Sequence, residues 1–416
     1  MSNTVLDSMA MGYQPVWNRA RQLSAVRLEV RTLHPESVDA EHLMEVLGDD
    51  WPESAPVLIV AIQSPTLLRQ ALGCEPVQNT WLEVPAAQFE DPEKLNRLTL
   101  AARRGHKLVR RAPLAALRGA HAPQVDVRGL LDLGAEDALA ALQSSADAGI
   151  PSRQRRAPTP ILPGQIYAGV SSQLLARHCL DEAGALGLLG WPDDDVLHAH
   201  RDRAAACDAG VILQVQKAIA EDASLDHLER LIRQDPVLVY RILMLVNSAA
   251  YGAGREIDSL RHAIMMLGFI ALGRWLQDMP KDKDPDPDLH PVRYAMVMRS
   301  RLAQHLLEHG SENNLRSEVY LTAVFAQLDR LMHKPLAELL GKLPLSGRVF
   351  DATLRHDGPY FSLLEVSRVQ GEPSELHRLS SVCHQHGLSL EHANRSLIRM
   401  LATSRDHDRP RPGRLH

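Results

Sequence analysis

The chain has 416 residues, with 46 Lys and Arg against 51 Asp and Glu and a formal net charge of -5. At roughly 150 residues per domain, this length predicts two or three domains. A hydrophobic fraction of 45% excludes a wholly disordered chain, and the acidic balance excludes nucleic-acid binding by bulk positive charge. The 4 cysteines form no Cys-x-x-Cys pair, which excludes a disulfide scaffold and a cysteine-rich zinc module.

The first half of the sequence has the pattern of a mixed α/β domain. An apolar run at 57–62 is typical of a buried parallel strand, and further strands are predicted at 80–84, 107–109 and 124–127. A helical pattern precedes Gly105, with apolar residues between 95 and 101. Strands that alternate with helices indicate parallel βα units.

The second half is predicted to be helical. A proline- and arginine-rich stretch at 149–164 is typical of a loop or linker, and the helical pattern begins near Asp195. Apolar residues at 225–232 share one helix face, and Asp235-Pro236 then supplies a cap and a first-turn proline for the next helix. Asp258-Ser259 caps a third helix. Further helices are predicted at 292–308, 318–331, 336–340 and 392–401.

The termini and apolar runs predict a cytoplasmic protein without a membrane segment. Residues 1–13 lack a basic region followed by an apolar run, as an export signal would have. The longest apolar stretch, at 263–273, is shorter than the roughly 18 residues that a spanning helix needs.

The block at 228–276 resembles the HDOD domain, a helical relative of the HD phosphohydrolases found in bacterial signalling proteins. The resemblance rests on ordered matches that include Asp235-Pro236, the run NSAAYG at 247–252, Ser259-Leu260 and Leu267-Gly268. It implies a helical domain with a role in signal transduction.

The first half resembles an EAL domain, the TIM-barrel-like domain that precedes HDOD in EAL-HDOD proteins. Gln14 to Trp17 and Arg27 to Arg31 resemble the opening strands, with Glu29 at the place of the motif's glutamate. The segments 105–111, 167–170 and 188–191 resemble later strands. The fold class expected is therefore α/β plus all-α: a degenerate TIM-barrel-like EAL domain followed by a helical HDOD domain.

The resemblance also implies that the catalytic chemistry is lost. Active EAL domains hydrolyse cyclic di-GMP with metal ions held by carboxylates. Here Arg110 and Arg111 stand where paired aspartates are expected, and Glu29 and Asp126 alone are too few ligands. We predict no catalytic residues, no metal site and no cofactor. A leftover carboxylate, solvated or paired with a nearby arginine, is the favoured interpretation of Glu29. For Arg110 and Arg111 surface solvation is favoured, and the alternative is that they hold an anionic ligand by charge and forked hydrogen bonds.

The helical domain departs from the HD catalytic pattern in the same way. The helix at 323–330 places Ala326-Gln327 where the His-Asp dyad of an HD enzyme would lie, and no histidine precedes Asp329. Asn247, Ser248 and Tyr251 lie at a predicted helix junction, where capping and packing are the favoured roles. The alternative is that these three residues line a ligand or partner cleft.

Together these features predict a non-catalytic bacterial regulator that acts through protein–protein contacts of its HDOD domain. The predicted division is an EAL-like domain at 10–193, an HDOD domain at 194–404 and a disordered tail at 405–416. Expected partners are signalling proteins such as nucleotide cyclases or two-component regulators, without nucleic acid or membrane. The alternatives are a cyclic di-GMP sensor and a residual cyclic di-GMP phosphodiesterase or HD-type phosphohydrolase.

Overall fold

The computed structural model divides the chain into two compact units, which are described separately. The barrel unit comprises Met1–Val196 with Val369–His416, and the helical unit comprises Leu197–Arg368. Asp126, Tyr251 and the predicted tail at 405–416 lie outside the described residues. The residues that the structure describes are 5–33, 39–117, 127–146, 158–248, 259–279, 285–307 and 312–404.

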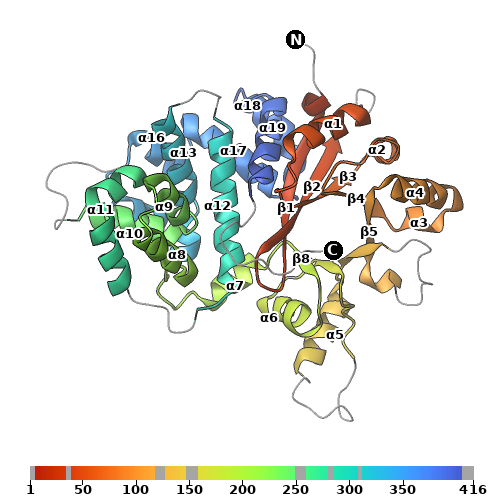
Figure 1. Ribbon diagram of the computed structural model, residues 1–416, viewed down its shortest axis with the longest axis horizontal. Coiled ribbons are helices and arrows are strands. Elements are labelled where there is room, and N and C mark those ends of the chain that lie inside the picture. Colours follow the sequence, from red (N-terminus) through yellow and green to blue (C-terminus); the bar gives the residue numbers. More distant parts are fainter. Residues whose placement is uncertain are drawn as a thin grey trace. The chain divides into compact units, whose positions relative to one another are not determined.

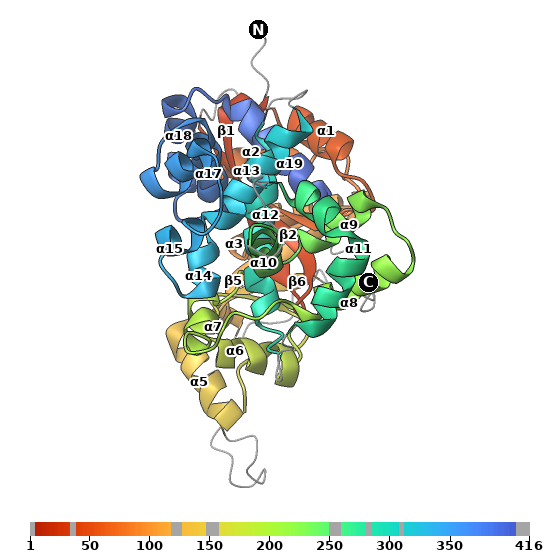
Figure 2. The same cartoon turned by 90° about the vertical axis from the view of Figure 1, so that its left-hand side faces the viewer.

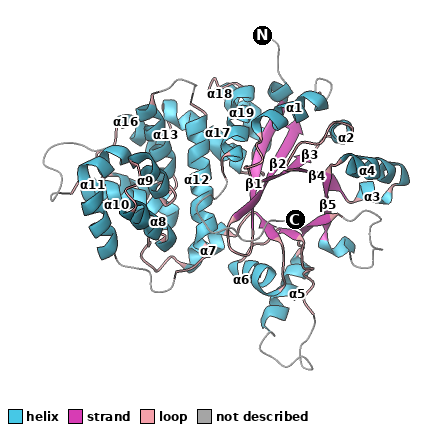
Figure 3. Ribbon diagram, in the orientation of Figure 1, coloured by secondary structure: helices cyan, strands magenta, loops and turns pink. Residues whose placement is uncertain are grey.

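Eight strands of the described chain close into a barrel in sequence order (Figures 1 and 3). β1 pairs antiparallel with both β2 and β8, and the other neighbours pair in parallel. The mixed α/β prediction is thereby confirmed. The strands are β1 (Met9–Trp17), β2 (Leu23–Thr32), β3 (Val57–Ile62), β4 (Thr80–Pro85), β5 (Lys107–Pro113), β6 (Arg128–Asp132), β7 (Ile166–Ala168) and β8 (Gly187–Leu189).

Helices connect the parallel strands, and most of them begin at a side chain that caps them. Asp39, Ser64 and Asp91 each accept hydrogen bonds from backbone N–H groups of the first turn. Gly105, at φ 108°, ends the helix before β5 in the left-handed conformation that glycine adopts without strain. The connecting helices are α1 (Ala40–Asp50), α2 (Pro65–Ala71), α3 (Ala87–Glu90), α4 (Pro92–Arg104), α5 (Ala135–Ala146) and α6 (Gln173–Arg177), and α7 (Asp193–Ala199) follows the last strand.

Strand alternation gives the barrel interior two kinds of layer. An apolar layer lies near the amino ends of the parallel strands and includes Ala25, Ile59, Trp81 and Val109. Because successive strand residues point to opposite faces, the residues two positions further along each strand point inward as well. The next layer toward the carboxyl ends is charged.

The C-terminal helices α18 (Leu379–Gln385) and α19 (Leu390–Ala402) belong to the barrel unit. α19 packs against β1 and α1 (Figure 1). The compact units therefore divide differently from the predicted boundary at residue 404, since the helical unit ends at Arg368. The first segment of the barrel unit ends at Val196, three residues after the predicted boundary at 193.

The helical unit follows the helix signals of the sequence. α9 (Leu225–Ile232) has the predicted bounds, and α10 (Pro236–Val246) is capped by Asp235 as predicted. Ser259 caps the next helix, which Gly268 interrupts at φ 71° and ψ 155°. α8, α9, α10 and α11 form one cluster (Figure 2). The remaining helices are α8 (Ala209–Ala220), α11 (Leu260–Asp278), α12 (Leu289–His305), α13 (Asn313–Phe325), α14 (Leu328–Met332), α15 (Leu336–Leu340), α16 (Gly347–Phe350) and α17 (Pro359–Gly371).

Candidate functional site: the charged layer of the barrel

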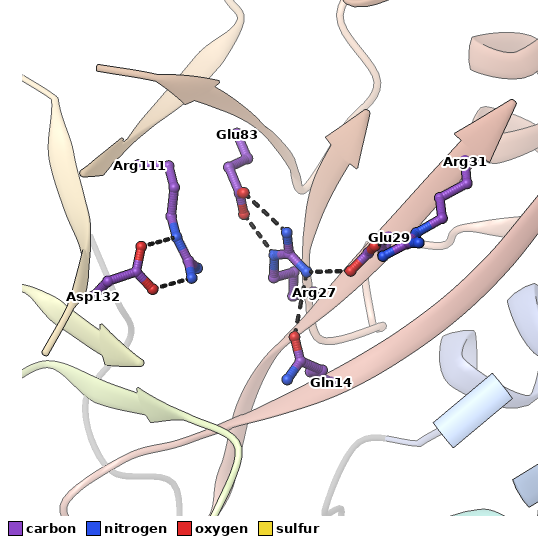
Figure 4. A network of polar contacts seen from close by, with 7 residues as sticks. All are labelled: Gln14, Arg27, Glu29, Arg31, Glu83, Arg111 and Asp132. Carbon is purple, nitrogen blue, oxygen red and sulfur yellow. Dashed lines mark hydrogen bonds and ion pairs between the residues drawn. The ribbon is translucent and has the colours of Figure 1, made fainter. Parts of the chain in front are cut away.

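Arg27 lies at the centre of the charged layer and joins two strands (Figure 4). Its Nε donates to Glu83 Oε2 at 2.6 Å and its Nη2 donates to Glu83 Oε1 at 3.0 Å, a bidentate pair between β2 and β4. Its Nη1 donates to Glu29 Oε2 at 3.0 Å. All three side chains are buried. One guanidinium therefore occupies the space between two acidic side chains.

Both Glu29 and Arg27 have a further polar contact at the edge of this cluster. Arg31 Nε donates to Glu29 Oε1 at 2.7 Å, so each oxygen of Glu29 accepts from an arginine. Gln14 Oε1 accepts from Arg27 Nη1 at 3.3 Å. Glu29 is thus a carboxylate whose two oxygens are paired with two different arginines.

A second bidentate pair crosses from β5 to β6 in the same layer (Figure 4). Arg111 Nε donates to Asp132 Oδ2 at 2.8 Å, and Arg111 Nη2 donates to Asp132 Oδ1. Arg111 therefore points into the barrel, where its charge is matched by an aspartate on the neighbouring strand.

The charges of this layer balance. Arg27, Arg31 and Arg111 face Glu29, Glu83 and Asp132, so the six groups carry no net formal charge. Burial alone lowers the pKa of Arg27, but the hydrogen bond and charge of Glu83, and then those of Glu29, outweigh burial and raise it. Each carboxylate of the layer is therefore paired with an arginine.

These residues do not fit the metal ions that an EAL-like barrel implies. A divalent cation of this kind needs several oxygen ligands from converging carboxylates. Here both oxygens of Glu29, of Glu83 and of Asp132 accept hydrogen bonds from guanidinium groups. In the part of the chain that the structure describes, no three His, Cys, Asp or Glu side chains are grouped so as to hold a metal ion.

Arg110 lies apart from this layer because strand alternation turns it to the outer face of β5. It is buried, and its guanidinium carbon lies 5.8 Å from the centroid of the Phe89 ring on α3. Its Nε has no hydrogen-bond partner among the described residues. The two adjacent arginines of the sequence therefore do not converge on one ligand.

The candidate residues of the helical unit make local contacts at helix ends. Asn247 Nδ2 donates to Leu243 O at 2.9 Å, and Ser248 Oγ donates to Leu245 O at 2.7 Å, both at the end of α10. Gln327, at the place of the HD dyad, donates from Nε2 to Ala323 O at 2.9 Å. These contacts have the geometry of helix-end capping.

Sequence reasoning missed Arg27, Glu83 and Asp132. The signal was available for the first two: Arg27 lies two residues before Glu29 on one strand, and Glu83 lies two residues after the inward-facing Trp81 on another. Asp132 was not predicted, because the predicted fourth strand, 124–127, ends before β6 begins. Residues 124–126 of that predicted strand lie outside the described residues.

The fold and site define a protein with an eight-stranded barrel whose acidic side chains are neutralised by arginines, joined to a helical unit. The helical unit contains an HDOD domain, because residues 208–337 match the HDOD domain family model.

Two relatives match parts of the chain. The uncharacterised protein YuxH of Bacillus subtilis is 28% identical over 152 residues, 36% of this chain and 37% of its own length. Cyclic di-GMP phosphodiesterase CdgJ of Vibrio cholerae is 27% identical over 188 residues, 44% of this chain and 42% of its own length. Each match thus spans less than half of the relative. The second match relates part of the chain to a protein of cyclic di-GMP signalling.

Two solved structures resemble part of the chain. The MmoQ response regulator of Methylococcus capsulatus covers 47% of this chain and 98% of its own, with a TM-score of 0.36 and 17% identity. A virulence factor of Campylobacter jejuni covers 47% of this chain and 83% of its own, with a TM-score of 0.28 and 14% identity.

Among the described residues, no helix combines the length and apolar character needed to cross a membrane.

Proposed function

We propose that this protein is a non-catalytic regulator of bacterial signal transduction that acts through protein–protein contacts of its HDOD domain. The observation that carries the non-catalytic part is the position of Arg27, whose guanidinium binds Glu29 and Glu83 together. A carboxylate held in this way faces a guanidinium cation, whose positive charge repels a metal ion from the same place.

The barrel is, in this proposal, a degenerate EAL-like domain. Its support is the inward position of Glu29 on the second strand of an eight-stranded barrel. Catalytic groups of barrels of parallel strands gather at the carboxyl ends of the strands, which is where the charged layer lies. In this chain that position holds ion pairs.

The contact surface of the HDOD domain is, we propose, formed by α8 and α11, which contact one another. These helices expose four large apolar side chains, of which Ile270 is 73% exposed, and exposed apolar side chains that gather on soluble domains mark interaction sites. Methionine adapts its shape to a partner, which suits a protein contact. The four are Leu213 on α8 and Met265, Met266 and Ile270 on α11.

We expect Ile270→Asp to abolish recovery of a signalling partner while leaving the fold intact. The side chain is exposed, so a charge there costs the folded state little, whereas a charge in the centre of an apolar contact removes binding. The measurement is affinity capture from cells with quantitative mass spectrometry, in which a nucleotide cyclase or two-component regulator is recovered with the wild type and lost with the variant.

The matched control is Leu139→Asp on α5, since Leu139 is a comparably exposed apolar residue of the barrel unit. It should keep the partner. Equal capture by wild type and Ile270→Asp, or equal loss with both variants, would contradict a contact through α11.

The second candidate function is a cyclic di-GMP sensor, which the match to a cyclic di-GMP phosphodiesterase favours. For a non-catalytic regulator we expect neither turnover nor detectable heat when the purified chain is titrated with cyclic di-GMP in the presence of magnesium or manganese. Turnover that disappears in Glu29→Ala would show residual phosphodiesterase activity. Binding without turnover would establish the sensor instead.

A further inference from the structure

The outer face of β1 lacks a connecting helix of its own because β1 turns directly into β2. Residues 18–22 form this tight turn, in which Asn18 N–H donates to Gln22 O at 3.1 Å and Arg21 has a positive φ of 58°. In the parallel part of the barrel, helices connect the strands and cover them. At β1 the covering layer comes instead from the other end of the chain, as α19.

Asn394 of α19 binds the start of β1 through every polar atom of its side chain. Its Nδ2 donates to Leu6 O and to Met9 O, each at 2.8 Å, and its Oδ1 accepts from Met11 N–H at 3.1 Å. The side chain is 0% exposed. A fully buried amide with three backbone partners is costly to replace, because each partner would be left unpaired.

Gln370, the penultimate residue of α17, lies at the same place. Its Nε2 donates to Met11 O and to Ala393 O, both at 3.3 Å. Gly12 of β1 has no side chain to interfere: a Cβ there would lie 3.0 Å from Gln370 O and from a methyl group of Leu376. The strand and the C-terminal segment therefore meet backbone to backbone.

Charged side chains add further contacts around α19. Glu391 N–H donates to Asp7 Oδ1 at 3.0 Å, and Asp50 of α1 lies 3.4 Å from Arg399 Nε and 3.8 Å from Arg395 Nη1. The C-terminal segment 369–404 is thus fixed to the beginning of β1 and to the end of α1.

α17 is shared by the two units, since Pro359–Arg368 belong to the helical unit and Val369–Gly371 to the barrel unit. In the sequence, the helical unit is inserted between the two segments of the barrel unit, and the chain leaves it through α17. We propose that Asn394 and Gln370 form a latch that anchors the end of α17 on β1. Loosening the latch then loosens both β1 and α17, and a change at either is transmitted to the other.

The test is hydrogen–deuterium exchange on the full-length chain with Asn394→Ala. We expect the amides of β1 and of α17 to exchange at least about tenfold faster, because three buried hydrogen bonds are lost and local opening becomes easier. Exchange in α9 and α10 should not change. Faster exchange in β1 with unchanged α17 would overturn the coupling, and unchanged exchange in both would overturn the latch.

Two further variants keep the test decisive. Ser381→Ala is the control on α18, where the exposed hydroxyl donates only to Arg378 O nearby in sequence, and it should leave exchange unchanged. Gln370→Met is the milder variant if Asn394→Ala does not fold. It removes the two long hydrogen bonds of the latch at nearly constant side-chain volume, so β1 and α17 should show the same acceleration at a smaller amplitude. Unchanged exchange there would likewise overturn the latch.

Discussion

Replacing Arg27 with methionine is expected to destabilise the barrel unit by about 3–5 kcal/mol, the usual cost of removing one partner from a buried ion pair. The substitution keeps an unbranched apolar stem in place of the inner part of the arginine side chain, but leaves Glu29 and Glu83 buried without their shared cation. Urea unfolding followed by tryptophan fluorescence measures this, since Trp17, Trp51, Trp81 and Trp191 belong to the barrel unit and only Trp275 to the helical unit.

The matched control for Arg27 is Arg31→Met on the same strand. The Arg31 side chain is 40% exposed, and the ion pair that it forms with Glu29 is worth no more than about 1 kcal/mol in such a setting. Arg31 still pairs with Glu29 in Arg27→Met, so Glu83 is the buried carboxylate that loses its cation. Adding Glu83→Gln removes that charge and should restore part of the lost stability. Equal losses for Arg27→Met and Arg31→Met would show that burial does not set the strength of the cluster.

Three strands of the barrel, β3, β4 and β5, could be predicted because each is a local pattern. The apolar run at 57–62 coincides with β3, and the run at 80–84 falls within β4. The partner of Arg27 could not be predicted, because Glu83 lies 56 positions further along the chain and meets Arg27 only when the barrel closes. Alternation predicts which face of a strand a side chain occupies. Whether that side chain then meets solvent, a metal ion or an arginine depends on residues that are distant in the sequence.

The position of the C-terminal helices shows the same limit. The pattern at 392–401 correctly predicted a helix, observed as α19. An amphipathic helix has an apolar face whichever surface it covers, so periodicity could not assign α19 to the barrel unit. The decisive contacts of Asn394 join residues 383 to 388 positions apart. The local elements were thus predictable, and the long-range contacts that combine them were not.

Replacing Asp235 with alanine is expected to destabilise the helical unit by about 2–3 kcal/mol, through loss of a helix cap and of a buried hydrogen-bond acceptor. Asp235 is fully buried, its Oδ1 accepts from Val237 N–H at 2.9 Å, and its Oδ2 accepts from Asp208 N–H at 2.6 Å. It therefore caps α10 and fixes the start of α8. Differential scanning calorimetry of the full chain measures the loss. The matched control, Asp226→Ala, removes an exposed aspartate paired with Arg261 and should change stability by no more than about 0.5 kcal/mol.

The cost of Asp235→Ala should also depend on pH with a defined sign. Burial raises the pKa of Asp235 above its ordinary value of 3.8, and this outweighs the opposing effect of Arg293. The folded state therefore binds the Asp235 proton more tightly than the unfolded state does. The stability contributed by this shift is fully present below pH 3.8 and is lost as the pH rises through the folded-state pKa. The difference in unfolding free energy between wild type and Asp235→Ala should thus be larger in acid than at neutral pH. A difference that grows as the pH rises would mean that the hydrogen bonds from Val237 and Asp208 stabilise the ionised carboxylate more than burial disfavours it.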